Sequence, residues 1–280
     1  MSVTQAAILG IVQGLTEFLP ISSTAHLLLV QHWFGIQDDM MIFDIALHWG
    51  TLVAVFIYFA REIGQTVIHT VLFLIRRPRG AAAREEFLNH YPYALTGGLI
   101  LLATLVTGFV GVFCLEFFKF LIQSIFAVGV TWLMMGVLLI LSARIKNLER
   151  ERTLAEMHHR DAFFIGLAQG ISLMPGISRA GATILMGLKC GLTPRDSARY
   201  SFLLSIPAIL GIGLLKLEEG IQFFRMRPEI YGTGFAAAMI VGILAIKVLF
   251  QVLERGKYHY FGYYCLAAGI FAMASPFLKP

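Results

Sequence analysis

Long apolar stretches alternate with short polar segments along the whole chain. A helix that spans the hydrocarbon core of a bilayer needs about 20 consecutive, mainly apolar residues. Six stretches meet this requirement and predict six transmembrane helices, at 41–60, 92–113, 119–142, 196–215, 230–253 and 259–276. No polar linker divides the 280 residues, so we expect a single all-α membrane domain over residues 1–280.

Two further apolar regions are each interrupted by a short polar turn. The first covers 3–35 and breaks at 20–23, and the second covers 161–190 and breaks at 175–178. Pieces of about 10 to 16 residues reach only ~15–24 Å as helices, which is short of the ~30 Å core. Both regions therefore predict a re-entrant hairpin, in which a half-helix enters the membrane, turns, and returns to the same side.

The two broken regions also resemble each other. Segment 10–16 (GIVQGLT) matches segment 166–172 (GLAQGIS) at an offset of about 156 residues. After a slip of one residue the tips match as well, Pro20 and Ser23 with Pro175 and Ser178. The chain therefore contains an internal repeat.

Each half of the chain, about 1–142 and about 161–280, then holds one hairpin and three spans. A hairpin returns to its own side, whereas three spans change side, so the second half must enter the membrane from the opposite face. This predicts an inverted-topology repeat, which brings the broken helices of both halves together near the midplane.

Composition and charge agree with a membrane protein. The chain is 58% hydrophobic and 14% charged, whereas soluble domains carry about 25% charged residues. Of the Lys and Arg residues, 15 lie on the side of the predicted loops 61–91 and 143–160 and 5 on the other side. The positive-inside rule makes the first side cytoplasmic and both termini external. The basic residues occupy short loops, so no nucleic-acid partner is expected.

Polar side chains gather in the first hairpin, where they are costly and mark function by default. Gln13 and Glu17 are four residues apart and share one helix face. Pro20 ends that half-helix. Ser22 or Ser23 can N-cap the returning half-helix.

The first turn of the returning half-helix holds Thr24 and His26, and the second hairpin offers a similar turn. Ser178 is expected to be an N-cap, and Arg179 then lies in the first helical turn. Gly181 permits a close backbone approach. Asp44 and His48 begin a full span, where they are expected to have a structural or mouth-lining role.

Two half-helix N-termini with hydroxyl groups make an anion site, and Arg179 adds a bidentate ligand for phosphate. Glu17 can hold a divalent cation, act as a base, or serve as a structural partner of Arg179. His26 can be a nucleophile or a general acid. Together these groups favour phosphoryl transfer. Of the two candidate nucleophiles we favour His26, with Ser23 assisting, and the choice stays open.

The motifs at 13–26 (QGLTEFLPISSTAH) and 175–183 (PGISRAGAT) closely resemble those of the undecaprenyl-diphosphate phosphatase family, also called the bacitracin-resistance family. The resemblance covers the whole chain in length, span order and repeat pattern. It implies hydrolysis of undecaprenyl diphosphate at the outer side of the bacterial cytoplasmic membrane, which recycles the lipid carrier for cell-wall synthesis. It also implies a divalent cation, Mg²⁺ or Ca²⁺.

The candidate site residues fall into three groups that share the two motifs. The catalytic candidates are His26, Ser23, Glu17 and Arg179, the substrate-binding candidates are Ser22, Thr24, Ser178, Gly181 and Thr183, and the metal candidates are Glu17 and Gln13. Gln13 is neutral where family members can carry a glutamate, which leaves a two-carboxylate metal site in question.

The expected partners are a polyprenyl diphosphate substrate and membrane lipids, and a homodimer is left open. A polyprenyl-phosphate transporter is the alternative function, because inverted repeats and half-helices suit it equally well. A transporter does not require Glu, Ser, His and Arg side chains to converge on one centre, so the chemistry favours the enzyme.

Overall fold

The computed structural model describes residues 1–36, 40–144 and 152–278, and these residues form helices without a β-strand. A single backbone bridge, between Arg152 and Leu192, ties the segment before the second hairpin to the segment after it. The predicted all-α class is confirmed. Of the basic residues assigned to the cytoplasmic loop 143–160, Lys146 and Arg150 lie outside the described residues.

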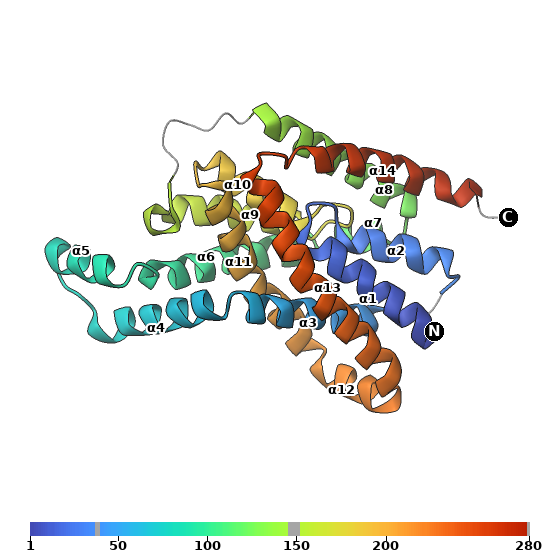
Figure 1. Cartoon of the computed structure of the whole chain (residues 1–280), viewed down its shortest axis with the longest axis horizontal. Coiled ribbons are helices and arrows are strands. Elements are labelled where there is room, and N and C mark those ends of the chain that lie inside the picture. Colours follow the sequence, from blue (N-terminus) through green and yellow to red (C-terminus); the bar gives the residue numbers. More distant parts are fainter. Residues whose placement is uncertain (37–39, 145–151, 279–280) are drawn as a thin grey trace.

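Eight α-helices belong to the first half of the described chain and six to the second (Figure 1). The first eight are α1 (Val3–Phe18), α2 (Ser23–Trp33), α3 (Met41–Tyr58), α4 (Ala60–Arg76), α5 (Ala81–His90), α6 (Ala94–Phe113), α7 (Leu115–Ile122) and α8 (Ile125–Leu141). The other six are α9 (His159–Ile171), α10 (Arg179–Lys189), α11 (Pro194–Leu215), α12 (Leu217–Met226), α13 (Pro228–Glu254) and α14 (Tyr260–Leu278).

Four helices in the described ranges, α3, α6, α11 and α13, are long and apolar enough to cross a membrane. They correspond to four of the predicted spans. Helices α7 and α8 together would make a fifth, and α14 contains a shorter apolar helix over Tyr260–Ser275. The protein is therefore a multi-pass membrane protein.

The span predicted at 119–142 is wrong at its start. Helix α7 meets α8 at an angle of 109°, and α8 begins only at Ile125. Ser124 is extended and its hydroxyl accepts a hydrogen bond from the Ala127 backbone N–H (3.3 Å), so it ends one helix and starts another. The predicted loop 61–91 is also largely helical, because it forms α4 and α5.

Both predicted breaks are present. Helices α1 and α2 pack against each other across a tip at 19–22, and α9 and α10 do so across a tip at 172–178. Ser22 caps α2 by accepting from Ala25 N (3.4 Å). Ser178 caps α10 by accepting from Gly181 N (3.1 Å). We call 19–22 the first tip and 172–178 the second tip.

The caps correct the alignment of the two hairpins. Ser22 and Ser178 are 156 residues apart (178 − 22), the offset that also separates Gln13 from Gln169. No slip is needed, so the counterpart of Ser178 is Ser22 rather than Ser23. The first helical residue after each cap is Ser23 in one half and Arg179 in the other. The slip was suggested by the two prolines, which do not occupy equivalent places in the tips.

Each hairpin packs against a helix of the other half. Helix α1 lies along α13 and α9 lies along α6, while α8 and α14 form a pair of their own (Figure 1). An added Cβ would lie 2.8 Å from Ala238 O at Gly14 and 2.6 Å from Val110 Cβ at Gly170. Gly14 and Gly170 are equivalent positions (170 − 14 = 156). The repeated glycines therefore allow the same close helix contact in both halves.

We expect Gly14→Ala and Gly170→Ala each to lower stability by about 1–3 kcal/mol, since the inserted methyl group overpacks a close contact. The matched control is Gly98→Ala in α6, where an added Cβ meets nothing within 4 Å. Thermal unfolding of the purified proteins in detergent measures the difference. If Gly14→Ala and Gly98→Ala unfold at the same temperature, the close contact of Gly14 with α13 does not contribute to stability.

Candidate functional site

The Glu17 carboxylate is buried near the end of α1, with 6% of the residue exposed. Gln13 Nε2 donates to Glu17 Oε2 over 3.0 Å, and the Ser23 hydroxyl donates to the same oxygen over 2.6 Å. Arg179 Nη2 donates to the other oxygen, Oε1, and forms an ion pair with it. Glu17 therefore joins the two hairpins at one point, although Arg179 is 162 residues away in sequence.

Ser23 and Arg179 reach this point from equivalent places. Each is the first residue of a half-helix and follows the serine that caps it, Ser22 or Ser178. The unpaired backbone N–H groups of a helix's first turn, together with its dipole, favour an anion. The two N-termini and the guanidinium thus provide positive potential beside the Ser23 hydroxyl. Glu17, Ser23 and Arg179 therefore meet at one point.

Ser178 and Gly181 hold the two tips together. The Ser178 hydroxyl donates to the backbone oxygen of Leu19 (3.3 Å) in the first tip. A Cβ added at Gly181 would lie 3.3 Å from Pro20 Cβ, so glycine permits the close approach. Thr183 is placed differently, because its hydroxyl bonds to Arg179 O (2.8 Å) and to Ser201 Oγ (2.6 Å), which ties α10 to α11.

His26 is held by the first tip, α8 and α14. Its Nδ1 lies 2.7 Å from the backbone oxygen of Ser22, which can only accept, so Nδ1 carries a proton. Its Nε2 lies 2.7 Å from the Tyr264 hydroxyl, and the ring stacks on Tyr264 and packs edge-on against Trp132. The pairing of His26 with Ser23 that the spacing allowed is not formed, since the Ser23 hydroxyl donates to Glu17 instead.

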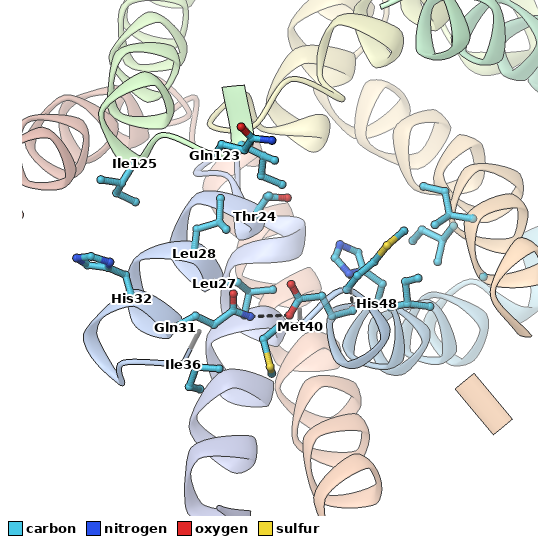
Figure 2. A pocket seen from close by; sticks show the side chains of 17 residues that line it. Thr24, Leu27, Leu28, Gln31, His32, Ile36, Met40, His48, Gln123 and Ile125 are labelled. Atoms are coloured by element: carbon cyan, nitrogen blue, oxygen red, sulfur yellow. Dashed lines mark hydrogen bonds between the residues drawn. The ribbon is translucent and has the colours of Figure 1, made fainter. Parts of the chain in front are cut away.

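A cavity of about 720 Å³ adjoins the cluster around Glu17 through His48. It lies between α2, the start of α3, the α7–α8 junction and the last part of α11 (Figure 2). Its wall includes Thr24 and His48, and His48 Nε2 is 3.6 Å from Glu17 Oε2. The polar lining residues are Thr24, Gln31, His32, Asp44, His48 and Gln123. Asp44 and His48 therefore line the cavity, which agrees with the structural or mouth-lining role expected for them.

Sequence reasoning missed Gln31, which hydrogen-bonds to Asp44 Oδ1 over 2.7 Å across the cavity (Figure 2). A signal for it was available, because Thr24, Leu28 and Gln31 share one helix face at positions i, i+4 and i+7. No comparable signal exists for Gln123, which lies in the sharp α7–α8 junction that the apolar pattern concealed.

A divalent cation fits only in part. Within residues 1–36, 40–144 and 152–278, no three His, Cys, Asp or Glu side chains gather closely enough to hold an ion. Gln13 Oε1 is nevertheless buried without a hydrogen-bond partner, on the side chain whose nitrogen binds Glu17. An amide oxygen and one carboxylate fit a cation such as Mg²⁺ that takes its other ligands from substrate phosphates and water.

Comparisons with known proteins agree with this geometry. Residues 6–271 match the family model described as "Bacitracin resistance protein BacA". A protein of Halothermothrix orenii named undecaprenyl-diphosphatase is 38% identical over 274 residues, and the alignment covers 96% of each chain. Proteins of the same name from Methanosphaera stadtmanae and Methanobrevibacter smithii are 36% and 38% identical, again over 96% of each chain. The chain therefore belongs to the bacitracin resistance protein BacA family.

Proposed function

We propose that this protein hydrolyses undecaprenyl diphosphate to undecaprenyl phosphate and inorganic phosphate. The observation that carries the proposal is the meeting of the Ser23 hydroxyl and the Arg179 guanidinium on the buried Glu17 carboxylate. Relatives named undecaprenyl-diphosphatase align with nearly the full length of the chain. Their name supports the choice of substrate.

The diphosphate binds where the two half-helix N-termini meet. Arg179 and the first N–H groups of α2 and α10 neutralise its negative charge, and the planar guanidinium orients the terminal phosphoryl group. The first isoprene units occupy the adjacent cavity, whose apolar lining includes Leu27, Leu28, Ile45, Ile209 and Ile212. A cavity with an apolar wall and a charged end suits a lipid diphosphate.

Ser23 attacks the terminal phosphorus. Its oxygen forms a bond to phosphorus, its proton passes to Glu17 Oε2, to which it already donates, and the bond from phosphorus to the bridging oxygen breaks. Undecaprenyl phosphate leaves with the bridging oxygen. Water then cleaves the phosphoserine, giving inorganic phosphate and restoring the hydroxyl. Glu17 acts as the base in a nucleophile–base pair.

The geometry thus favours Ser23 over His26 as the nucleophile, which reverses the preference drawn from sequence. His26 Nδ1 carries a proton, which it donates to Ser22 O, and Nε2 accepts from the Tyr264 hydroxyl. Both ring nitrogens are therefore engaged by groups other than Glu17 and Ser23. His26 supports the first tip.

A divalent cation would supply charge neutralisation at this site. Gln13 Oε1 and Glu17 would hold it from the protein side.

The reaction takes place at the outer side of the bacterial cytoplasmic membrane and recycles the lipid carrier for cell-wall synthesis, which confers bacitracin resistance. Six spans cross the membrane and two re-entrant hairpins enter it from opposite faces, as an inverted repeat with both termini outside. Several observations support this topology: the excess of Lys and Arg on one side, the equivalent caps of the hairpins and the exchange of helix contacts between the halves.

Ser23→Ala is expected to abolish release of phosphate from undecaprenyl diphosphate by the detergent-purified protein, because the attacking oxygen is lost. His26→Ala is expected to keep measurable turnover, reduced by about 10- to 1,000-fold through misplacement of the tip. Acid quench of the wild-type reaction should trap a phosphorylated serine at position 23. Phosphohistidine at position 26, or turnover by Ser23→Ala above that of His26→Ala, contradicts the assignment. A wild-type protein that releases no phosphate instead favours a transporter.

Arg179→Lys keeps the charge and loses the planar fork. We expect kcat/KM to fall by about 10²- to 10³-fold, as for loss of a group that stabilises charge in the transition state, while the protein still inserts and folds. Arg199→Lys is the matched control, since Arg199 is a partly buried arginine that pairs with Asp196 (3.5 Å) and Glu62 (4.0 Å). Activity of Arg179→Lys within twofold or so of that control would show that Arg179 is only a structural charge.

A further inference from the structure

Helix α8 touches both tips through neighbouring residues. Trp132 is fully buried, and its indole Nε1 donates to the backbone oxygen of Ile21 (2.9 Å) in the first tip. The hydroxyl of Thr131, the preceding residue, donates to the backbone oxygen of Pro175 in the second tip. Adjacent positions of one helix therefore hold the two halves of the site.

The first tip is strained and heavily supported. Ser22 has a φ of 65°, which is uncommon for a residue other than glycine. Such a conformation persists only where the surroundings over-determine it. Every carbonyl of the tip accepts a hydrogen bond from a side chain: Leu19 O from Ser178, Pro20 O from Cys265, Ile21 O from Trp132, and Ser22 O from His26.

The second tip lies directly on the same turn of α8. Gly176 has a φ of 94°, and a Cβ added there would collide with the Thr131 hydroxyl and lie 2.9 Å from the Trp132 backbone nitrogen. Behind this turn α8 packs closely on α14, since a Cβ added at Gly129 would lie 2.9 Å from Gly269 O. The turn of α8 that contacts both tips is therefore also packed against α14.

We propose that Thr131 and Trp132 are positioning residues that set the distance between Ser23 and Arg179. The inference rests on the proposed function, because that distance matters only if Ser23 attacks a phosphoryl group held by Arg179. Ser23 follows Ile21 by two residues and Arg179 follows Pro175 by four. Neighbouring residues of an α-helix keep a fixed separation along its axis, so the tips cannot shift relative to each other without breaking one of the two hydrogen bonds.

The test compares Trp132→Phe, which keeps a ring and loses the N–H donor, with Thr131→Val, which keeps the shape and loses the hydroxyl. For each variant we expect kcat on undecaprenyl diphosphate to fall by about 10- to 100-fold, the effect of a misplacement near 1 Å, with KM changed by less than about threefold. Thr131→Ser restores the donor and should recover most of kcat. The matched control is Thr104→Val, since the Thr104 hydroxyl donates to Ile100 O within its own helix (2.7 Å).

Amide hydrogen exchange of the same full-length proteins gives a readout that does not depend on activity. Trp132→Phe should speed exchange in 19–22 more than in 172–178, and Thr131→Val should do the reverse. Unchanged kcat per folded molecule, a loss that Thr131→Ser does not recover, or equal exchange changes in both tips would each overturn the proposal. If the wild type releases no phosphate, the proposed function fails, and tip-selective exchange would still show that α8 positions the two tips.

Discussion

The ion pair between Glu17 and Arg179 is the interaction on which the rest of the structure depends. A charged side chain at membrane depth is costly unless it is paired, and removing one partner of a buried pair is strongly destabilising. Neither hairpin contains both charges, so neither half can neutralise its own. The pair therefore requires the two tips to meet, and the close packing of α1 on α13 and of α9 on α6 permits the meeting.

The two halves share the same hairpin backbone and caps but carry different functional side chains. Equivalent caps, Ser22 and Ser178, present a hydroxyl on Ser23 in one half and a guanidinium on Arg179 in the other. The residue 156 positions after Glu17 is Leu173 (17 + 156), so the second half carries no matching carboxylate. The internal repeat thus contains one asymmetric site, with the Glu17 carboxylate and the Ser23 hydroxyl from the first half and the Arg179 guanidinium from the second.

The sequence predicted the parts of the site that follow from local chemistry. Proline and serine at the breaks, the i, i+4 spacing of Gln13 and Glu17, and the repeat itself were enough to expect a shared centre. The direction of His26 was not predictable, because it depends on Tyr264, 238 residues away. The α7–α8 bend was hidden for a different reason: only Gln123 and Ser124 separate two apolar stretches, so average hydropathy does not reveal the break that the Ser124 cap makes.

The surroundings of Glu17 bear on the choice between hydrolysis and transport. Helices α3 and α11 both pass the cavity at one end, at His48 and Ile212, and meet an aromatic cluster at the other. In that cluster Phe202 packs against Phe18 at 5.5 Å, Phe59 at 5.6 Å and Phe250 at 6.1 Å between ring centroids. Phe18 follows Glu17 directly in α1, and His48 connects the carboxylate to the cavity. The proposed hydrolysis needs only the cavity, because substrate would enter and product would leave through it, whereas transport would also require the aromatic cluster to open.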